Sequence, residues 1–411
     1  MSSHHLRIYS SAFLLFALLG VVLCGCAGIS SQAENQPSPT PTPIPAGPAD
    51  HVLLQTGPKG TDYKEFAVSD SGLQQVGQDV TLPTAARSSD PNMASAHGFL
   101  FALDSGPVAA IDTFVADATS GTFSLVRQQA LEPGAGAFSI DPSGTYLYVN
   151  ESHDDPLTGP PTGYESNLNA FHIEANGTLT QVPGAPFVFA GGPNTGLDCC
   201  LSLGSRLAFT PDGTRAYAVT VEGCPCHGAP GFWTVQPFVR DANTGAIAKN
   251  NLQQGPPPTS EFSIGGVVVA KRGKYVIFPT IDGLTVYSID PTTGSLTQAA
   301  VPSPVPATDT GHPYVDISAT ADGEFVYLDQ PGSKLIFGFH VQADGSLVPV
   351  PGSPYNAGNM GHLTLSNTDR FLFIQDFTQG FMAFKRDSDS GALVQLSSSP
   401  VPAVWSILSL N

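Results

Sequence analysis

Hydrophobic and polar residues alternate in short runs along most of this chain, a pattern typical of β-strands that bury one face. Clear examples are LNAFHIE (168–174), LTVYSID (284–290) and LIFGFHV (335–341). Each of these runs leads into a turn that contains glycine, and another alternating strand follows. Outside the N-terminus, no long window carries apolar residues at helical spacing. The pattern therefore predicts an all-β protein built from many short strands.

The glycine turn occurs seven times, which indicates a repeat. Such a tight turn needs a positive φ, which a residue with a Cβ adopts only at a cost. A second marker lies about half a repeat earlier in most units: a short strand, a turn and an aromatic-rich strand, as in FSIDPSGTYLYVN (138–150). Each unit therefore contains four strands, which we call a to d in chain order. The seven turn glycines are Gly72, Gly121, Gly177, Gly245, Gly294, Gly345 and Gly391.

A repeated unit of four antiparallel strands is the blade of a β-propeller. The repeats begin with HVLLQTG (51–57), a b strand without its a strand, and end with VWSILSL (404–410), an a strand without its b strand. We expect the last strand to become the innermost strand of the first blade, because this closure removes two free edges. The predicted fold class is all-β, a seven-bladed β-propeller over residues 51–411. A ring of six or eight blades, or two separate domains, fits the markers less well.

Two blades carry insertions. They are residues 151–166 in blade 3, after strand b, and residues 190–204 and 223–230 in blade 4, before strand a and after strand b. Since the strands are antiparallel, the b–c and d–a connections lie at the same end of the ring. Loop additions on one face of a repeat fold usually line the functional side. We therefore expect the site at this end of the central channel.

The N-terminus indicates export. An apolar run from Ile8 to Leu23 follows a weakly basic start and ends in Leu23-Cys24-Gly25-Cys26. This sequence resembles the lipobox of bacterial lipoproteins, which implies a signal peptide over residues 1–25, lipid on Cys26 and an anchor in the cell envelope, at the outer membrane or cell surface. The alternative is an ordinary secretory signal without lipid. Residues 26–50 are rich in proline and polar residues, so we expect a disordered tether.

Charge narrows the classes of partner. The chain has 16 Lys and Arg against 34 Asp and Glu, a formal net charge of −18. Nucleic acid binding needs a basic face, and the scattered cations provide none. A small anionic substrate would need a local cationic pocket. We expect no cofactor, a monomeric chain, and a ligand that is a small molecule, a protein or a glycan.

Four cysteines lie in the two insertions of blade 4, in Cys199-Cys200 and in Cys224-Pro225-Cys226-His227. In an oxidising compartment, an even set in two facing loops favours two disulfides that join Cys199 and Cys200 to Cys224 and Cys226 in an order that remains open. A metal site with His227 and redox-active thiols are the alternatives. Similarly, Glu151, Asp154 and Asp155 could hold Ca²⁺, although a solvated acidic loop is the simpler interpretation. We expect no metal.

The blade motifs resemble those of the seven-bladed lactonase family, which includes the 6-phosphogluconolactonase type and the muconate-lactonizing type. The shared elements are P-D-G-x-x-x-Y-V, D-x-T-G-x-L and P-G-S-P after several d strands, as in PGAP (183–186) and PGSP (351–354). The resemblance covers essentially residues 51–411. It implies the propeller fold and, less specifically, hydrolysis of a lactone at one end of the channel.

The family's proposed catalytic groups are Arg, His and Glu, and this chain keeps part of that pattern. Arg206 is retained without an adjacent His, Glu151 follows strand b of blade 3, and Glu222 falls about one position late. His312 and His362 precede the a strands of blades 6 and 7. The resemblance implies these five residues as catalytic candidates, with Glu151 or Glu222 as the base and Arg206 as the partner of the oxyanion.

Two functions remain open at this point. The first is an envelope-anchored lactonase-like hydrolase that acts on an unphosphorylated, sugar-derived or similar lactone. A phosphorylated substrate fits less well, because cytoplasmic sugar phosphates do not reach the cell envelope. The second is a non-catalytic propeller that binds a protein, a glycan or a small ligand there. The lactonase-like repeats favour the first, and the incomplete catalytic pattern favours the second.

Overall fold

The computed structural model describes the propeller part of the chain. The described residues are 50–410, except for 57–60, 83–92, 105–108, 117–122, 132–134, 155–163, 191–201, 204–205, 223–231, 251–265, 281–282, 301–304, 306–315, 331–332, 358–359, 377–379 and 402–405. These described residues form strands, turns and irregular segments without a helix. Among them, accordingly, no helix is long and apolar enough to cross a membrane.

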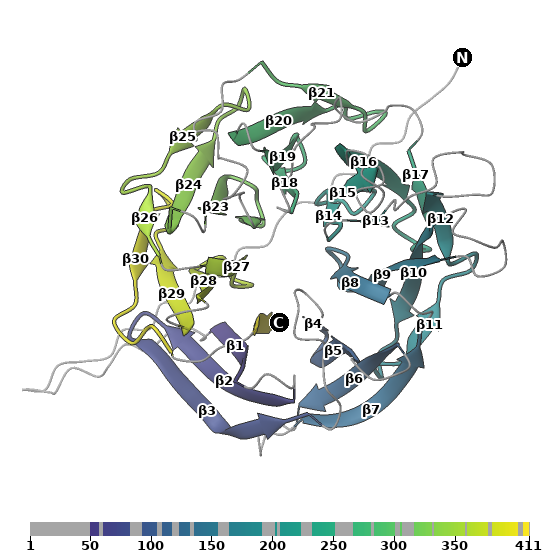
Figure 1. Cartoon of the computed structure of the whole chain (residues 1–411), viewed down its shortest axis with the longest axis horizontal. Coiled ribbons are helices and arrows are strands. Elements are labelled where there is room, and N and C mark those ends of the chain that lie inside the picture. Colours follow the sequence, from purple (N-terminus) through teal and green to yellow (C-terminus); the bar gives the residue numbers. More distant parts are fainter. Residues whose placement is uncertain are drawn as a thin grey trace, which may run out of the picture. The chain divides into compact units, whose positions relative to one another are not determined.

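The strands form seven antiparallel sheets arranged in a ring (Figure 1), which confirms the predicted seven-bladed β-propeller. From the innermost strand outwards, blade 1 consists of β31 (Ser406–Leu410), β1 (Asp50–Gln55), β2 (Asp62–Ser69) and β3 (Gly72–Thr81). Blade 2 consists of β4 (Met93–Ala96), β5 (Phe99–Leu103), β6 (Ala110–Ala116) and β7 (Phe123–Ala130). Blade 3 consists of β8 (Ala135–Ile140), β9 (Tyr146–Asp154), β10 (Tyr164–Ile173) and β11 (Leu179–Gln181), with β12 (Phe187–Ala190) also paired to β10.

The other four blades follow the same order. They are β14 (Ala208–Phe209), β15 (Arg215–Glu222), β16 (Phe232–Arg240) and β17 (Ile247–Lys249), with β13 (Ser202–Leu203) also paired to β15; β18 (Val268–Ala270), β19 (Tyr275–Thr280), β20 (Gly283–Ile289) and β21 (Leu296–Gln298); β22 (Ile317–Ala319), β23 (Phe325–Gln330), β24 (Leu335–Val341) and β25 (Leu347–Pro349), with β26 (Tyr355–Asn356) paired to β24; and β27 (Met360–Leu365), β28 (Phe371–Asp376), β29 (Gly380–Arg386) and β30 (Leu393–Gln395).

The ring closes as the incomplete end repeats predict. Strand β31 pairs with β1 in antiparallel register, with Leu408 opposite Leu53. A side-chain hydrogen bond joins the two ends of the ring as well, since the Thr368 hydroxyl of blade 7 donates to the buried Asp50 carboxylate at 2.6 Å. The closing strand therefore removes the inner edge of blade 1, and the first and last blades are held together.

The turn glycines adopt the positive φ that the repeat requires, at six of the seven positions; the seventh, Gly121, lies outside the described residues. Space is a second reason for glycine. At Gly391, where φ is +73°, a Cβ would come within 2.4 Å of the ring of Phe325 in the preceding blade. The c–d turn of one blade thus packs against the b strand of its neighbour.

Tyrosines on three b strands tie neighbouring blades together. The hydroxyl of Tyr148 donates to the carbonyl of Gly245 at 2.8 Å, that of Tyr217 to Gly294 at 3.1 Å, and that of Tyr327 to Gly391 at 2.6 Å. Burial raises the pKa of Tyr148 and of Tyr217 to about 12, so both phenols remain neutral donors. The Y-V element of the repeat is therefore a structural link at one end of the ring.

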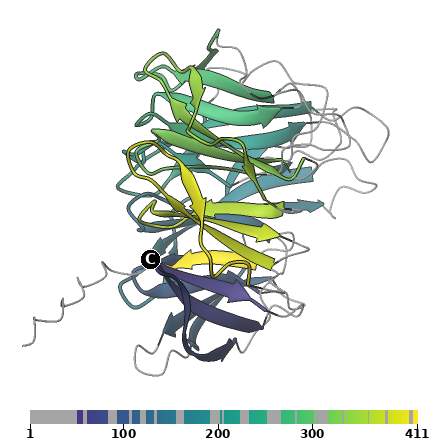
Figure 2. The same cartoon turned by 90° about the vertical axis from the view of Figure 1, so that its left-hand side faces the viewer.

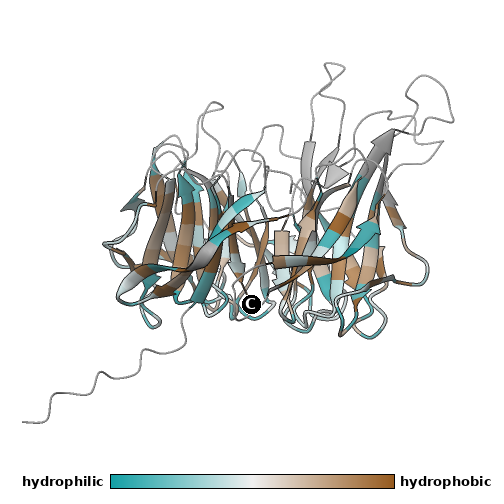
Figure 3. Cartoon of the chain, turned by 90° about the horizontal axis from the view of Figure 1, so that it is seen from below, coloured by the Kyte–Doolittle hydropathy of each residue, from teal (hydrophilic) through white to brown (hydrophobic). Residues whose placement is uncertain are grey.

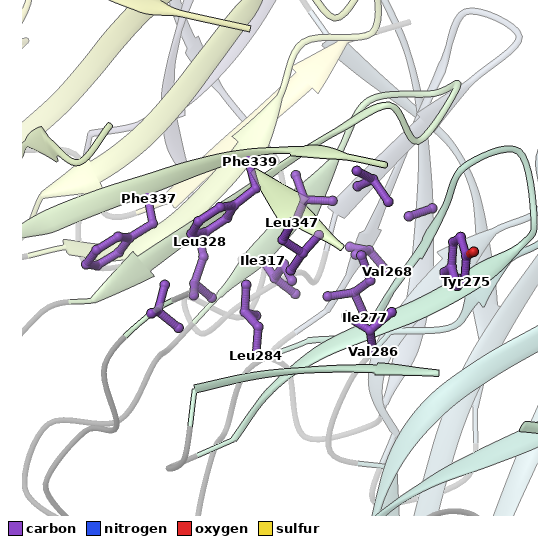
Figure 4. Close-up of a cluster of buried hydrophobic side chains, with 14 residues drawn as sticks. Val268, Tyr275, Ile277, Leu284, Val286, Ile317, Leu328, Phe337, Phe339 and Leu347 are labelled. Atoms are coloured by element: carbon purple, nitrogen blue, oxygen red, sulfur yellow. The ribbon is translucent and has the colours of Figure 1, made fainter. Parts of the chain in front are cut away.

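The hydrophobic core lies between the blades. Seven clusters of buried side chains fill the interfaces between adjacent sheets. Figure 4 shows the cluster between blades 5 and 6, where Ile277 and Val286 face Leu328 and Phe339. Alternating positions along each strand face the preceding and the following blade, which explains why the b strands of these blades are apolar in nearly every position.

One interface also contains a buried ion pair. Arg240 of β16 lies 3.1 Å from Asp141, and the two side chains are 1% and 2% exposed. The same guanidinium donates to the Gly213 carbonyl at 2.7 Å and to the Tyr148 hydroxyl, and it stacks on the ring of Tyr146. The pair therefore joins blades 3 and 4 at several points.

The two ends of the ring differ. The a–b and c–d turns lie at the end that carries the C-terminus, which we call the turn face, and Figure 3 shows hydrophilic residues there. The innermost strands begin at the opposite end, which we call the loop face, and the side view in Figure 2 shows the strands running between the two. At the loop face, β9 and β10 extend into the blade 3 insertion as far as Asp154 and from Tyr164 onwards, and β13 lies within the blade 4 insertion.

Candidate functional site

The candidate site lies at the loop face, where the innermost strands begin and the b strands end. Arg206 lies just before β14, and His362 lies near the start of β27. Glu151 lies in the last part of β9, and Glu222 is the last residue of β15. The antiparallel order therefore brings these four residues to one end of the ring. The side chain of Glu222 and all of His312 lie outside the described residues.

Strand register shows that two catalytic candidates, Arg206 and His362, occupy equivalent positions in their blades. Ala208 pairs with Tyr217, Ser318 with Tyr327 and Thr364 with Phe373, each at the same step of its blade. The residue two positions earlier in each blade lies at the beginning of the innermost strand. In blades 4 to 7 this position, which we call the rim position, is held by Arg206, Gly266, Asp316 and His362.

His362 lies against a carboxylate of the neighbouring blade. Its Nδ1 is 2.6 Å from Oδ2 of Asp316, and the two side chains are 13% and 17% exposed. The imidazole and carboxylate form an ion pair whenever the ring is protonated. With Nδ1 facing the carboxylate, Nε2 is the ring nitrogen directed away from it. A His–carboxylate pair of this kind orients an imidazole for proton transfer.

The Asp316 carboxylate is itself fixed by backbone groups. Its Oδ2 accepts a hydrogen bond from Leu363 N of blade 7 at 3.1 Å, and its Oδ1 accepts one from Ile317 N at 2.9 Å. Asp316 N in turn donates to Oδ1 of the fully buried Asp329 at 2.6 Å, and Asp329 N donates to the Asp316 carbonyl at 3.1 Å. Asp316 is therefore held on both its main chain and its side chain.

Glu151 occupies a different environment. Its side chain is fully buried, and Oε1 accepts a hydrogen bond from Asn169 Nδ2 at 3.2 Å. Oδ1 of the same Asn169 accepts from Gln181 Nε2 at 3.0 Å, which fixes the amide. The carboxylate is thus part of the packed interior of blade 3, and it is less accessible to a ligand in the channel than His362 is.

Arg206 is exposed at the loop face. The following residue is anchored, because Leu207 N donates to the Ser139 hydroxyl of blade 3 at 2.9 Å and the Leu207 side chain is buried. Arg206 is the cation among the described rim residues, and a guanidinium there supplies donors for an anionic oxygen.

Sequence reasoning missed Asp316 and Asp329. Asp316 directly precedes the short strand β22, so it looks like an ordinary loop residue, and Asp329 lies within an apolar b strand. Alignment of the rim positions was the available signal, because Asp316 falls in the same place as Arg206 and His362.

Most residues in the predicted metal and disulfide sites lie outside the part of the chain that the structure describes. Among the residues that the structure describes, no group of three or more His, Cys, Asp or Glu side chains could hold a metal ion. Cys26, the four cysteines of blade 4 and Asp155 lie outside those residues.

Comparison with known protein families indicates the class of protein to which the fold corresponds. The model of the family "Lactonase, 7-bladed beta-propeller" matches residues 272–408, about a third of the chain. This match confirms the resemblance that the blade motifs indicate. Together with the seven blades observed over the described residues, it defines the protein as a lactonase-like β-propeller. No curated protein matches the chain.

Solved structures share the fold at low identity. A protein from Lactobacillus plantarum is 18% identical, with a TM-score of 0.63, over 88% of this chain and 100% of that one. A putative 6-phosphogluconolactonase from Bacteroides fragilis is 16% identical, with a TM-score of 0.61, over 90% and 100%. The periplasmic gluconolactonase of Pseudomonas aeruginosa is 16% identical, with a TM-score of 0.60, over 88% and 99%. At these identities the likeness extends to the fold.

Proposed function

We propose that this protein is an envelope-anchored hydrolase that opens an unphosphorylated, sugar-derived or similar lactone at the loop face of the propeller. The observation that carries the proposal is the pairing of His362 with Asp316 at the start of an innermost strand, in a lactonase-like fold. Lactone hydrolysis needs a base that activates water and donors that stabilise the oxyanion. His362 offers a partly exposed imidazole as the base, and Arg206 offers the donors.

Charge supports an unphosphorylated substrate. A phosphoryl group calls for several cationic or backbone donors close together. In blades 4 to 7 the rim residues comprise one cation, Arg206, together with Gly266, Asp316 and His362. With an overall charge of −18, the protein also opposes the approach of a dianion. A neutral lactone that becomes anionic only in the transition state fits this distribution of charge.

The test is turnover of a panel of unphosphorylated aldono- and aromatic lactones by the propeller, residues 51–411. Removing one oxyanion donor costs about 10²–10³-fold in kcat, so we expect Arg206→Ala to lose activity on that scale. Arg370→Ala is the matched control, because Arg370 pairs with Asp70 on the turn face. Glu222→Ala tests the remaining carboxylate, and its matched control is Glu174→Ala in an exposed turn. Equal losses in a variant and its control would contradict a site at the loop face.

A second candidate function is binding without catalysis, of a protein, a glycan or a small ligand. The burial of Glu151 favours it, because this residue is one of the two carboxylates that the family resemblance implies as the base. A folded protein that turns over none of the lactones would support this function and overturn the hydrolase.

Anchoring is proposed from the sequence, where Cys26 ends the apolar run of the signal peptide. Intact-mass and peptide analysis of the protein from a bacterial membrane fraction should find diacylglycerol on Cys26. A mature N-terminus downstream of residue 26 without lipid would contradict the anchor. The same peptide mapping, done without reduction, should link the Cys199-Cys200 peptide to the one that holds Cys224 and Cys226, whereas four free thiols would favour the metal site.

A further inference from the structure

The pairing of His362 with Asp316 is more than interblade packing requires. The interface between the innermost strands of blades 3 and 4 solves the same packing problem with a neutral group, since Leu207 N donates to the Ser139 hydroxyl at 2.9 Å. Between blades 6 and 7, Leu363 N, which is equivalent to Leu207 N, donates instead to the Asp316 carboxylate. A hydroxyl is sufficient for this contact, so the charge of Asp316 needs another explanation.

The cost of placing charge here supports a functional explanation. Asp316 and His362 are both largely buried, and partly buried ionisable groups lose hydration that their mutual attraction only partly restores. Asp329, which is fully buried, adds a second carboxylate at hydrogen-bonding distance from Asp316 N. Asp316 at the start of the innermost strand of blade 6, Asp329 on the neighbouring strand β23 and His362 on the innermost strand of blade 7 together hold the imidazole ring in one orientation.

We infer that Asp316 is the positioning residue of a His362–Asp316 pair in which Nε2 of His362 is the base that activates water for lactone hydrolysis, and that Asp329 holds Asp316 in place. The inference rests on the proposed function, and it names which of the possible bases acts at that site. Asp316 contacts Nδ1 and does not need to touch the substrate. Its role is to favour the tautomer with the proton on Nδ1, in which the lone pair that accepts a proton is on Nε2.

The reaction balances with water as the only co-reactant. Nε2 of His362 takes a proton from water while the oxygen of that water forms a bond to the lactone carbonyl carbon. The ring C–O bond of the resulting tetrahedral intermediate breaks, and the proton on Nε2 passes to the departing ring oxygen. The product is the open hydroxy acid, and His362 returns to its starting state. Arg206 stabilises the oxyanion in the hypothesis above.

The experiment measures kcat and KM of Asp316→Asn, for the best substrate of the lactone panel. Asparagine keeps the shape, and when its amide oxygen accepts from Ile317 N, its NH2 group takes the place of Oδ2 and cannot accept the proton of Nδ1. General-base catalysis contributes about 10²–10⁴-fold, so we expect kcat to fall within that range while KM changes less than about threefold. Asp389→Asn in an exposed turn of blade 7, at the opposite face, is the matched control and should keep the wild-type kcat.

Three further measurements separate positioning from structural support. Added formate should restore part of the kcat of Asp316→Ala, and added imidazole part of that of His362→Ala, because each replaces the missing group without changing the fold. The ¹⁵N shifts of the His362 ring should report a proton on Nδ1 in the wild type and a change of tautomer in Asp316→Asn. Asp329→Asn should lower kcat less than Asp316→Asn does, because Asp329 acts only through Asp316.

The outcomes are distinct. A kcat of Asp316→Asn close to the wild-type value would overturn the inference and leave the proposed hydrolase in place. A fall in kcat that comes with a fall in Tm, without rescue by formate and without a change of tautomer, would likewise overturn the inference in favour of a structural role for Asp316. A wild-type protein that hydrolyses no lactone would overturn the proposed function, and the role of His362 as a base would fall with it.

Discussion

Removal of the Arg240 side chain tests whether interblade polar contacts stabilise this ring. Arg240→Leu keeps an apolar stem against Tyr146 but leaves the Asp141 carboxylate, 2% exposed, without its cation. Loss of one partner of a buried pair costs about 3–5 kcal/mol. Since unfolding entropy is roughly 2.1 cal/mol/K per residue, about 360 residues give about 0.8 kcal/mol/K. We therefore expect Tm to fall by about 4–7 °C.

The assay is calorimetric melting of the propeller at neutral pH, beside two further variants. Arg370→Leu is the matched control, because its pair with Asp70 is 38% and 55% exposed and such pairs contribute about 0–1 kcal/mol. Its Tm should stay within about 1 °C of the wild type. The double variant Arg240→Leu/Asp141→Asn should regain part of the loss, since no charge is left buried and Asn keeps the contact with Tyr146 N. A Tm of Arg240→Leu no lower than that of Arg370→Leu would refute the reasoning.

Three other predictions concern the turns, the closure of the ring and pH. Gly323→Ala should lower Tm more than Gly98→Ala, because both glycines have a positive φ but a Cβ on Gly323 meets the backbone of blade 5, 2.4 Å from Lys271 N, whereas Gly98 faces open space; equal shifts would contradict the packing argument. Deletion of residues 404–411 should expose the inner edge of β1 and cause aggregation on size-exclusion chromatography, and a soluble monomer of wild-type Tm would refute closure by β31. Burial raises the pKa of the Asp369 carboxyl above its ordinary value, so the folded state holds this proton more tightly and stability declines as pH rises from the ordinary pKa of an aspartate through the raised one. Asp369→Asn should remove this decline from a Tm–pH profile, and an unchanged profile would count against it.

Much of the fold could be predicted from the sequence, because the repeat is written in residues with a backbone or packing role. Glycine at Gly245 or Gly294 is required both by a positive φ and by the aromatic or arginine side chain that packs over it. Alternation gave the blade faces, and the incomplete end repeats gave the pairing of β31 with β1. Strand ends were less predictable: β9 and β10 continue into what reads as a polar insertion, because strand pairing extends beyond the apolar positions.

The site was predictable only in part, for a reason that lies in the architecture. Two of the family-like motifs, P-D-G-x-x-x-Y-V and D-x-T-G-x-L, form the turns of the turn face, and their Tyr148, Tyr217 and Tyr327 hold neighbouring blades together. A functional site at the other end of the same strands carries no repeated residue, because each blade contributes a different side chain. Arg206 and His362 were found from fragments of the family pattern, whereas Asp316 gave no signal of its own.

This separation of the two ends suggests where activity is encoded in such a ring. In blades 4 to 7, residues at the rim position lie at the start of the innermost strands in the same register, so a substitution there alters this end of the ring while the turns at the opposite end keep the blades together. In this chain the rim carries a cation in blade 4, glycine in blade 5, a carboxylate in blade 6 and an imidazole in blade 7. The carboxylate and the imidazole meet because blades 6 and 7 are neighbours, and an exchange of Asp316 with the glycine of blade 5 would separate them. The order of residues around the rim, as well as their identity, therefore determines which side chains meet at this end of the ring.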